Sequence, residues 1–325
     1  MLNIHKCEDL EEARGLWQRH WPRQCLFDLW PVRYCFQAQF NHTPHFIVAR
    51  EKHEFRGMLA LSWVEEQQCF QHFPGEVWHG KTWLEQNKIL ASDPQVFSAL
   101  VEHIPGMAKI RYLNGDPRLA DDPAAVVDEV GYLFYPPQYD YSFQSYMQSF
   151  SGKTRKKLRS ELNRLTEEGV SYRYDRFDDV AHLFRMNLDT FKGESYFDDA
   201  RFLRAFENLL AWLQANRMLR VTTVLMGGRI AAVDVGAVWN RSYTVLAGGT
   251  HPDFPGVAKL INFHHMEWAC QQRLKEVDFL CGEFNWKHRF HLTTRPLYGM
   301  VNLPVSLASV PWQKAVHGLQ AACAI

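Results

Sequence analysis

The chain has 325 residues, of which 46% are hydrophobic and 22% are charged. This is the composition of a folded globular protein, so a disordered chain, a coiled coil and a collagen are excluded. Lysine plus arginine number 36 and aspartate plus glutamate also number 36, so the formal net charge is zero. A protein that coats nucleic acid through an overall basic charge is therefore not expected. At roughly 150 residues per domain, the length indicates two domains or one large one.

Cysteine usage and the start of the chain bear on its compartment. The seven cysteines are irregularly spaced and include no CxxC pair, which favours a reducing compartment over a disulfide framework. Residues 1–14 carry four acids and lack the apolar core of a signal peptide, and no apolar run is long enough to cross a membrane. We therefore expect a cytoplasmic protein without a transmembrane segment.

The first half of the chain mixes helices and strands. The hydrophobic pattern predicts, in chain order, a helix over 9–20, strands over 44–50 and 57–64, a helix over 94–103, and strands over 107–113 and 130–135. Asn114-Gly115-Asp116-Pro117 predicts a loop, and Pro136-Pro137 ends the last of these strands. Residues 136–152 are interpreted as a linker into a second unit.

The second half has a clearer pattern. Leu158, Leu162 and Leu165 recur at helical spacing, so residues 153–168 are predicted to form an amphipathic helix with Gly169 as its cap. The elements expected after it are a strand over 170–175, helices over 178–190 and 198–216, three strands over 219–226, 229–238 and 242–248, a helix over 257–273, and a strand over 276–281. The short turns between the three consecutive strands predict an antiparallel meander.

A meander followed by a loop, a helix and a strand resembles the core of GNAT-type N-acyltransferases. Four segments resemble motifs of the CelD-like subgroup, which is named for cellulose biosynthesis and is related to the Fem aminoacyltransferases. They are the basic helix at 151–169, the hairpin at 228–236, the loop-to-helix element at 253–260, and a G-x-x-x-[YW]-K-x-x-F signature within 279–290. The resemblance implies an α/β (α+β) fold of two tandem GNAT-like halves, each a mixed, largely antiparallel sheet flanked by helices. Residues 1–145 would form the N-terminal half and residues 146–325 the acyltransferase domain.

The loop-to-helix element is the candidate donor site. A helix N-terminus offers unpaired N–H groups and a positive dipole end that suit a pyrophosphate, and Gly256 allows close approach. By the resemblance, Gly256, Val257, Ala258 and Lys259 would contact the pyrophosphate of acetyl-CoA or another acyl-CoA. The family has Q/R-x-x-G-x-G/A here, whereas this chain has Asp253 in the leading position, with Lys259 as a partial substitute. The alternative is an ordinary Pro-Gly turn that starts a core helix.

Cations crowd the N-terminus of the helix at 153–168, where they oppose the helix dipole. They are Lys153, Arg155, Lys156, Lys157 and Arg159, with no acid before Glu161. A locally unfavourable choice suggests a function, so Arg155, Lys156 and Arg159 are candidates for holding an anionic substrate, a phosphate or a lipid surface. The alternative is a solvated polar face opposite the leucines.

Four further side chains are candidates for catalysis. Lys287 and Glu283 follow the last strand; the lysine would stabilise an oxyanion, as proposed for the matching lysine of Fem-like relatives, and Glu283 would accept a proton from an attacking amine. The alternative for this pair is a surface salt bridge. Asp234 lies between valines on a predicted strand, so it is a second base, a substrate ligand or a structural hydrogen-bond acceptor. Tyr243 on the next strand is a general acid or a core residue.

Metal and hydrolase chemistry find no support in the sequence. His264-His265 and His288-x-x-His291 lack the companions of a zinc site, so no metal is expected. No G-x-S-x-G occurs, and no cysteine has an obvious histidine partner.

The residues and the resemblance together predict an N-acyltransferase. It would move an acyl group from acyl-CoA to an amine on a small molecule, a sugar or an envelope or exopolysaccharide precursor, by direct attack in a ternary complex. Two alternatives stay open: a Fem-like aminoacyltransferase that uses aminoacyl-tRNA, and a non-catalytic GNAT-fold scaffold in polysaccharide assembly. DNA is not an expected partner, and peripheral contact with a membrane is left open.

Overall fold

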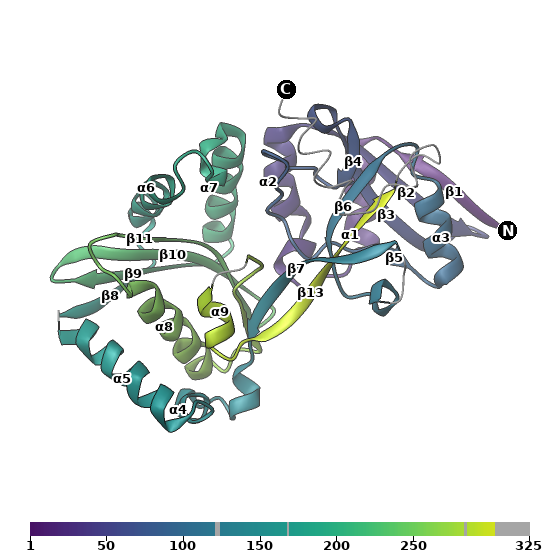
Figure 1. Ribbon diagram of the computed structural model, residues 1–325. Helices are drawn as coiled ribbons and strands as arrows, with labels where there is room; N and C mark the ends of the chain where they lie inside the picture. Colours follow the sequence, from purple (N-terminus) through teal and green to yellow (C-terminus); the bar gives the residue numbers. More distant parts are fainter. Residues whose placement is uncertain (121–123, 168, 283–284, 303–325) are drawn as a thin grey trace. The chain divides into compact units, whose positions relative to one another are not determined.

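The structure, a computed structural model, describes residues 1–120, 124–167, 169–282 and 285–302 (Figure 1). Contacts within the chain divide it into two compact units. The first contains Met1–Val130, Arg204–Leu209 and the described residues from Pro296 onward, and the second contains Gly131–Leu203 and Leu210–Arg295. Three elements pass from one unit to the other: β7 (Ala125–Phe134), α7 (Ala200–Ala215) and β13 (Thr293–Asn302). The predicted domain boundary between residues 145 and 146 stays a prediction.

The first unit is built on a largely antiparallel sheet with helices packed against it. Its strand order is β1-β2-β3-β4-β6-β13, in which β4 and β6 are parallel, and the short strand β5 pairs with β3. The elements are β1 (Leu2–Cys7), α1 (Leu10–His20), α2 (Trp30–Phe40), β2 (Thr43–Glu51), β3 (Glu54–Val64), β4 (Cys69–His72), β5 (Leu90–Ala91), α3 (Pro94–Glu102) and β6 (Ala108–Leu113). Met58 and Leu59, successive residues of β3, belong to different buried clusters, as expected for a strand covered on both faces.

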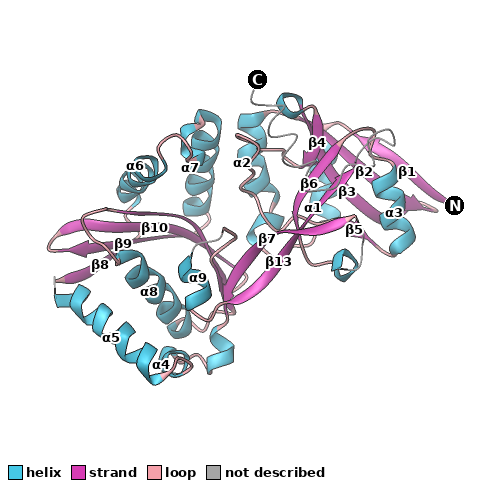
Figure 2. Cartoon of the chain, in the orientation of Figure 1, coloured by secondary structure: helices cyan, strands magenta, loops and turns pink. Residues whose placement is uncertain are grey.

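The second unit holds a sheet with the strand order β7-β12-β11-β10-β9-β8. Its other elements are α4 (Phe143–Gln148), α5 (Gly152–Glu167), β8 (Val170–Tyr174), α6 (Val180–Phe191), β9 (Leu219–Met226), β10 (Arg229–Trp239), β11 (Ser242–Thr250), α8 (Val257–Gln271), β12 (Glu276–Asp278) and α9 (Asn285–Arg289). β11 and β12 run parallel, whereas β8, β9, β10 and β11 form antiparallel neighbours. Helix α6 lies on one face of this sheet, and α8, with α5 beside it, lies on the other (Figure 2).

The predicted meander is confirmed. β9 pairs with β10 and β10 pairs with β11, both antiparallel. Gly227 and Gly228 both have positive φ in the first turn, as do Asn240 and Arg241 in the second. Two consecutive residues of positive φ match the right-handed twist of a tight hairpin, and glycine and asparagine accept this conformation at least cost.

Apolar contacts hold α5 and α8 against the meander. Leu165 of α5, Val224 of β9 and Ile261 of α8 belong to one buried cluster. The same cluster includes Val257, the first residue of α8. The loop-to-helix element is therefore anchored by a core on its own side of the sheet.

The expected mixed α/β fold with largely antiparallel sheets is confirmed, but several elements differ from the prediction. Helix α2 is not predicted from the sequence because most of its residues are buried, so it lacks a clear polar face. The strand expected over 276–281 ends at Asp278, and the linker expected over 136–152 contains α4. The C-terminal segment 305–325, for which we expect a docked helix or a loose tail, lies outside the described residues.

Candidate functional site

Strands β11 and β12 part after a short parallel ladder. They pair only at Ser242–Glu276, Tyr243–Val277 and Thr244–Asp278. Beyond this point β11 continues along β10 to Thr250, while Phe279 N donates to Tyr132 O of β7 at 2.9 Å. One edge of β11 therefore loses its neighbour after Thr244. Because α8 connects the two strands, its N-terminus and the carboxyl end of β11 meet at the same place, where α/β proteins commonly bind ligands.

A β-bulge lies in β11 just beyond this point. Val235 of β10 faces Ala247, but the next residue, Gly236, faces Val245, so Leu246 is the extra residue. A bulge leaves the extra residue out of the ladder and re-aims its backbone, and bulges are common next to active sites. The Leu246 backbone thus turns away from β10 where β12 has already diverged, which can direct an N–H group at a carbonyl oxygen bound there.

The predicted donor-site residues begin helix α8. Gly256 is the N-cap with φ of 95°, and Val257, Ala258 and Lys259 form the first turn. Leu165 of α5 lies 3.6 Å from where a Cβ of Gly256 would be, so a larger side chain at this position would fill the approach to the helix end. The placement of this element at a helix N-terminus agrees with the sequence analysis.

Ion pairs engage both charged side chains of the loop-to-helix element. Arg229 Nη2 lies 2.6 Å from Asp253 Oδ2, and this hydrogen bond lowers the pKa of Asp253. Lys259 pairs with Glu161 of α5, which lowers the pKa of that glutamate. The acid in the leading position is thus neutralised by a neighbour, and Lys259 can reach a phosphate only by sharing or leaving Glu161.

Asp234 and His265 form a buried pair between the sheet and α8. His265 Nε2 lies 2.9 Å from Asp234 Oδ2, and both residues are buried. Asp234 faces Gly248 across the ladder, and a Cβ at Gly248 would lie 2.3 Å from Asp234 Oδ1. Gly248 itself is exposed. The glycine therefore leaves room for the carboxylate beside the free part of β11, and Asp234 has a structural partner whatever its further role.

Tyr243 packs in the same cluster. Its ring lies over Gly236, where a Cβ would be 2.4 Å from Cε2, and its ring centroid is 5.2 Å from that of His265. Among the described residues its hydroxyl has no hydrogen-bond partner. Burial, reinforced by the charge of Asp234, raises the pKa of Tyr243 far above its ordinary value. The phenol thus stays protonated at neutral pH, and its role as a general acid stays a prediction.

Lys287 of α9 lies beneath the turn that follows β12. Its side chain is buried, and Nζ donates to the carbonyls of Phe279, Leu280 and Cys281 at 3.0, 2.9 and 2.8 Å. An ammonium has three N–H donors, and three carbonyls of this turn lie within hydrogen-bond distance of it. The lysine therefore fixes the segment that diverges from β11. Glu283, its predicted companion, lies outside the described residues.

The cations of α5 are mostly at the surface. Lys156 and Arg159 are exposed, whereas Arg155 is half-buried and its Nη1 reaches Gln148 O at 3.5 Å. Lys157 lies 3.9 Å from Glu161, the partner of Lys259. The basic helix and the start of α8 are thus neighbours through Glu161.

The structure brings Asp234 and Tyr243 together, while Lys287 holds a separate turn. The sequence did not predict the role of His265, because its pair with Asp234 forms only when α8 packs on β10. It also did not predict the bulge at Leu246. The two successive glycines Gly248 and Gly249 were the one sequence signal that other groups approach β11 closely at this point.

Among the described residues, no cluster of His, Cys, Asp or Glu could hold a metal ion. No described helix has the length and apolar character needed to span a membrane.

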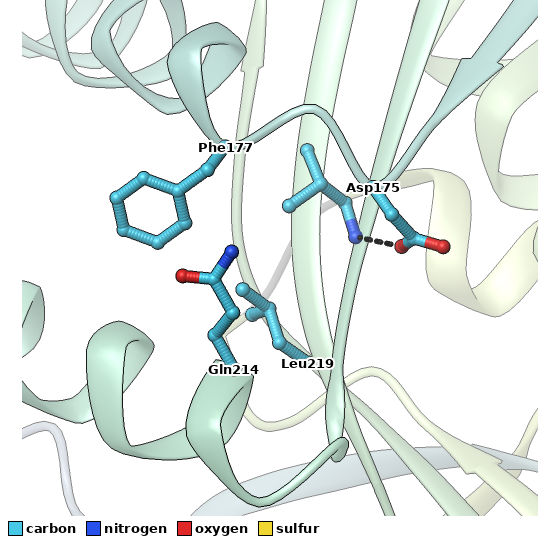
Figure 3. A pocket seen from close by; sticks show the side chains of 5 residues that line it. Asp175, Phe177, Gln214 and Leu219 are labelled. Carbon is cyan, nitrogen blue, oxygen red and sulfur yellow. Dashed lines mark hydrogen bonds between the residues drawn. The ribbon is translucent and has the colours of Figure 1, made fainter.

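A small cavity of about 60 Å³ also lies in the second unit (Figure 3). It is lined by Asp175, Phe177, Gln214, Leu219 and Val221. Asp175 Oδ1 accepts a hydrogen bond from Val221 N at 3.1 Å. Pockets for small-molecule ligands are about 300–1,000 Å³, so this cavity is too small for an acyl donor.

The chain is similar to a known protein family and to several solved structures. Residues 152–288 match a family model described as an acetyltransferase (GNAT) domain. The solved structure of FemX is similar over 93% of this chain and 98% of its own, with a TM-score of 0.57 and 10% identity. L-PGS from Bacillus licheniformis is similar over 97% of this chain and 96% of its own, with a TM-score of 0.57 and 9% identity. The C-terminal domain of a putative lysylphosphatidylglycerol synthetase from Agrobacterium fabrum is similar over 97% and 95%, with a TM-score of 0.55 and 12% identity. No curated protein matches the chain.

These findings define the class of the molecule. The domain match and the shared fold support a transferase with a GNAT-type acyltransferase fold. The expected mixed α/β fold with largely antiparallel sheets is confirmed, and the assignment of residues 1–145 to a first GNAT-like half stays a hypothesis. The CelD-like subgroup stays a hypothesis.

Proposed function

We propose that the chain is an N-acyltransferase that moves an acyl group from acyl-CoA to an amine. The observation that carries the proposal is the parting of β11 and β12 beside the N-terminus of α8. A strand edge without a neighbour exposes N–H and C=O groups, which suit the two amides of a pantetheine arm, and the helix end suits the pyrophosphate. The GNAT domain match over residues 152–288 includes all of these elements.

The proposed reaction is direct attack. The amine nitrogen attacks the thioester carbonyl, the carbon–sulfur bond breaks, and the amine proton passes to a base while the thiolate of CoA leaves. The backbone at Leu246 stabilises the oxyanion. Asp234 and Glu283 are the proposed bases, and the acceptor is an amine on a sugar or an envelope precursor. We place the reaction in the cytoplasm.

Lys287 is proposed to stabilise the oxyanion by exchanging one of its three carbonyl acceptors for it. We expect Lys287→Ala to lower turnover more than it weakens donor binding, because the interaction forms in the transition state. Lys275→Ala, which removes an exposed lysine of the same unit, is the matched control. Equal losses in turnover and donor affinity would show that Lys287 only holds the turn at 279–281.

A Fem-like aminoacyltransferase is the second candidate, and one observation favours it. The charged residues of the loop-to-helix element are engaged by Arg229 and Glu161, while α5 presents exposed cations that suit a polyanionic donor. Two of the similar structures are named FemX and the C-terminal domain of a putative lysylphosphatidylglycerol synthetase. Aminoacyl-tRNA would then replace acyl-CoA.

Calorimetric titration with acetyl-CoA separates these candidates. The proposal expects micromolar binding to the wild type and none to Gly256→Trp, whose indole would fill the space between the helix end and Leu165. Gly15→Trp is the control, because nothing lies within 4 Å of a Cβ placed there. If the wild type fails to bind, the acyl-CoA proposal is wrong, and charged tRNA is titrated next at two salt concentrations. Failure of both donors would support the non-catalytic scaffold.

A further inference from the structure

Arg220 of β9 is a cation held between aromatic rings in the second unit. Its guanidinium carbon lies 3.7 Å from the ring centroid of Trp268 and 5.0 Å from that of Tyr174. The Nε atom is fully buried without a hydrogen-bond partner, although the residue as a whole is partly exposed. Within the described part of the chain, the guanidinium forms no hydrogen bond or ion pair.

The rings beside Arg220 are themselves held in place. Tyr174 Oη lies 3.1 Å from His264 Nε2, and the rings of His264 and Tyr172 stack at 4.0 Å. Burial, with the neighbouring His265 and Arg220, lowers the pKa of His264 to about 4, so the imidazole is neutral at physiological pH. Tyr174 keeps 43% of its surface exposed. The guanidinium therefore contacts a fixed aromatic cluster, of which Tyr174 is exposed to solvent.

Two acids act electrostatically on this cluster, and both are engaged elsewhere. Asp175 accepts from the backbone of Val221, and Asp234 is paired with His265. Each acts on the cluster only through space: Asp175 on Arg220, and Asp234 on Tyr243. A partly buried cation normally gains a carboxylate partner, because stacking on rings supplies about 0.5–2 kcal/mol and leaves its N–H donors unmet.

We propose that Arg220 is the cation of an oxyanion-binding site, which takes a carboxylate or phosphate group of a ligand. A guanidinium presents two parallel N–H groups that match two oxygens of such a group, and the close contact with the Trp268 ring restricts the orientation of this fork. The site is separate from the start of α8. Trp268 is eleven residues beyond Val257, so about 16 Å of helix lies between them. The ligand can be a second anionic group of the acceptor or a separate effector.

The test follows the Arg220 Nε–H resonance in ¹H–¹⁵N spectra of the full chain, assigned by its loss in Arg220→Lys. Sodium phosphate and sodium acetate are added in separate titrations, each against sodium chloride at equal ionic strength. We expect a saturable shift with at least one oxyanion and none with chloride. A shift with phosphate alone assigns a phosphate ligand, and a shift with acetate alone assigns a carboxylate.

Arg176→Gln is the control variant, because it removes an exposed arginine just after β8 and should leave the titration unchanged. No shift with either oxyanion, or an equal shift with chloride, would overturn the site and leave Arg220 as a packing residue. If Arg220→Lys does not fold, the loss of the same resonance in Arg220→Met gives the assignment, so the wild-type titration still decides the outcome. It also involves no acyl donor, so it is independent of the proposed reaction.

Discussion

Each unit contains an arginine that is at least partly buried, and the two guanidinium groups differ in their partners. In the first unit, Arg33 is 1% exposed, and its guanidinium donates to the carbonyls of Phe27, Phe73 and Glu85 at 2.8, 3.0 and 3.3 Å. In the second unit, the guanidinium of Arg220 only stacks on rings. A cation whose N–H groups all donate to backbone carbonyls holds those segments of the chain together. A cation that only stacks on rings has N–H groups that can still donate to a ligand.

The same distinction applies to the proposed site residues. Lys287 resembles Arg33 in its three carbonyl acceptors, and its proposed catalytic role requires it to exchange one of them for the oxyanion. Lys259 has one carboxylate partner that a phosphate could displace. Measurements of the free energy of unfolding can test both the structural role of Arg33 and the proposed ligand role of Arg220.

The largest effect is expected for Arg33→Met. This change removes the donor from three buried carbonyls at once, and each unmet buried group costs about 1–3 kcal/mol. We expect the free energy of unfolding to fall by roughly 3–5 kcal/mol, at the upper end for single substitutions. Urea denaturation measures it, with the exposed Arg23→Met as the control. A loss below about 0.5 kcal/mol, the range of ordinary surface substitutions, would contradict the proposal that Arg33 holds the backbone through these three carbonyls.

A pH dependence is expected from His72, a neighbour of Arg33 in the first unit. Burial first, and then the charge of Arg33, lower its pKa from 6.5 to about 3. The folded state therefore favours neutral His72, so its contribution is complete above pH 6.5 and is lost as the pH falls toward 3. At pH 5 the loss is about 2 kcal/mol, from 1.5 pH units at 1.36 kcal/mol each.

His72→Gln should flatten the fall of stability between pH 6.5 and 4, whatever its effect at pH 7. The measurement is urea denaturation of both proteins across this range. Parallel curves would show that His72 is protonated in the folded state, and that its buried environment is less apolar than its 6% exposure indicates.

Local signals predicted more of the second unit than of the first. Leucines at helical spacing and glycine-rich turns lie within a few residues of one another, so α5 and the meander could be predicted. Helix α2 is buried on most sides, and the end of β12 depends on β7 from elsewhere in the chain, so neither leaves a local pattern.

In the candidate site too, residues with a local sequence signal could be predicted and residues that depend on distant neighbours could not. Gly256 could be placed at the start of α8 because Pro-Gly is a local signal for a helix start. His265, Arg220 and the bulge at Leu246 could not be found, because each depends on which strand or helix faces it. The Asp234–His265 pair, for example, joins residues from β10 and α8. These are contacts of register and packing, which periodicity does not encode.

A smaller effect is expected for Gly248→Ala, which tests how firmly Asp234 is held. The new Cβ would lie 2.3 Å from Asp234 Oδ1, so the carboxylate must shift away from His265. We expect a loss of roughly 1–2 kcal/mol, in the range of overpacking substitutions. In an Asp234→Ala background the same change should cost almost nothing, giving a coupling energy of about 1 kcal/mol or more. If the two substitutions change the free energy of unfolding additively, the Asp234 carboxylate can shift without cost and is not held firmly by His265. Gly152→Ala, which meets nothing within 4 Å, is the control.

The smallest effect is expected for Arg220→Met, and it decides whether the two arginines differ. Methionine keeps an apolar chain against Trp268, and the change breaks no hydrogen bond within the described part of the chain. The lost cation–π contact, about 0.5–2 kcal/mol, is offset by relief from holding a charge in a partly buried place. We therefore expect the unfolding free energy to change by less than about 1 kcal/mol, in contrast to Arg33→Met. A loss as large as that of Arg33→Met would mean that Arg220 has a structural role equal to that of Arg33. A near-zero change, together with loss of any stabilisation by phosphate or acetate, would mean that the second unit keeps this charge for a ligand.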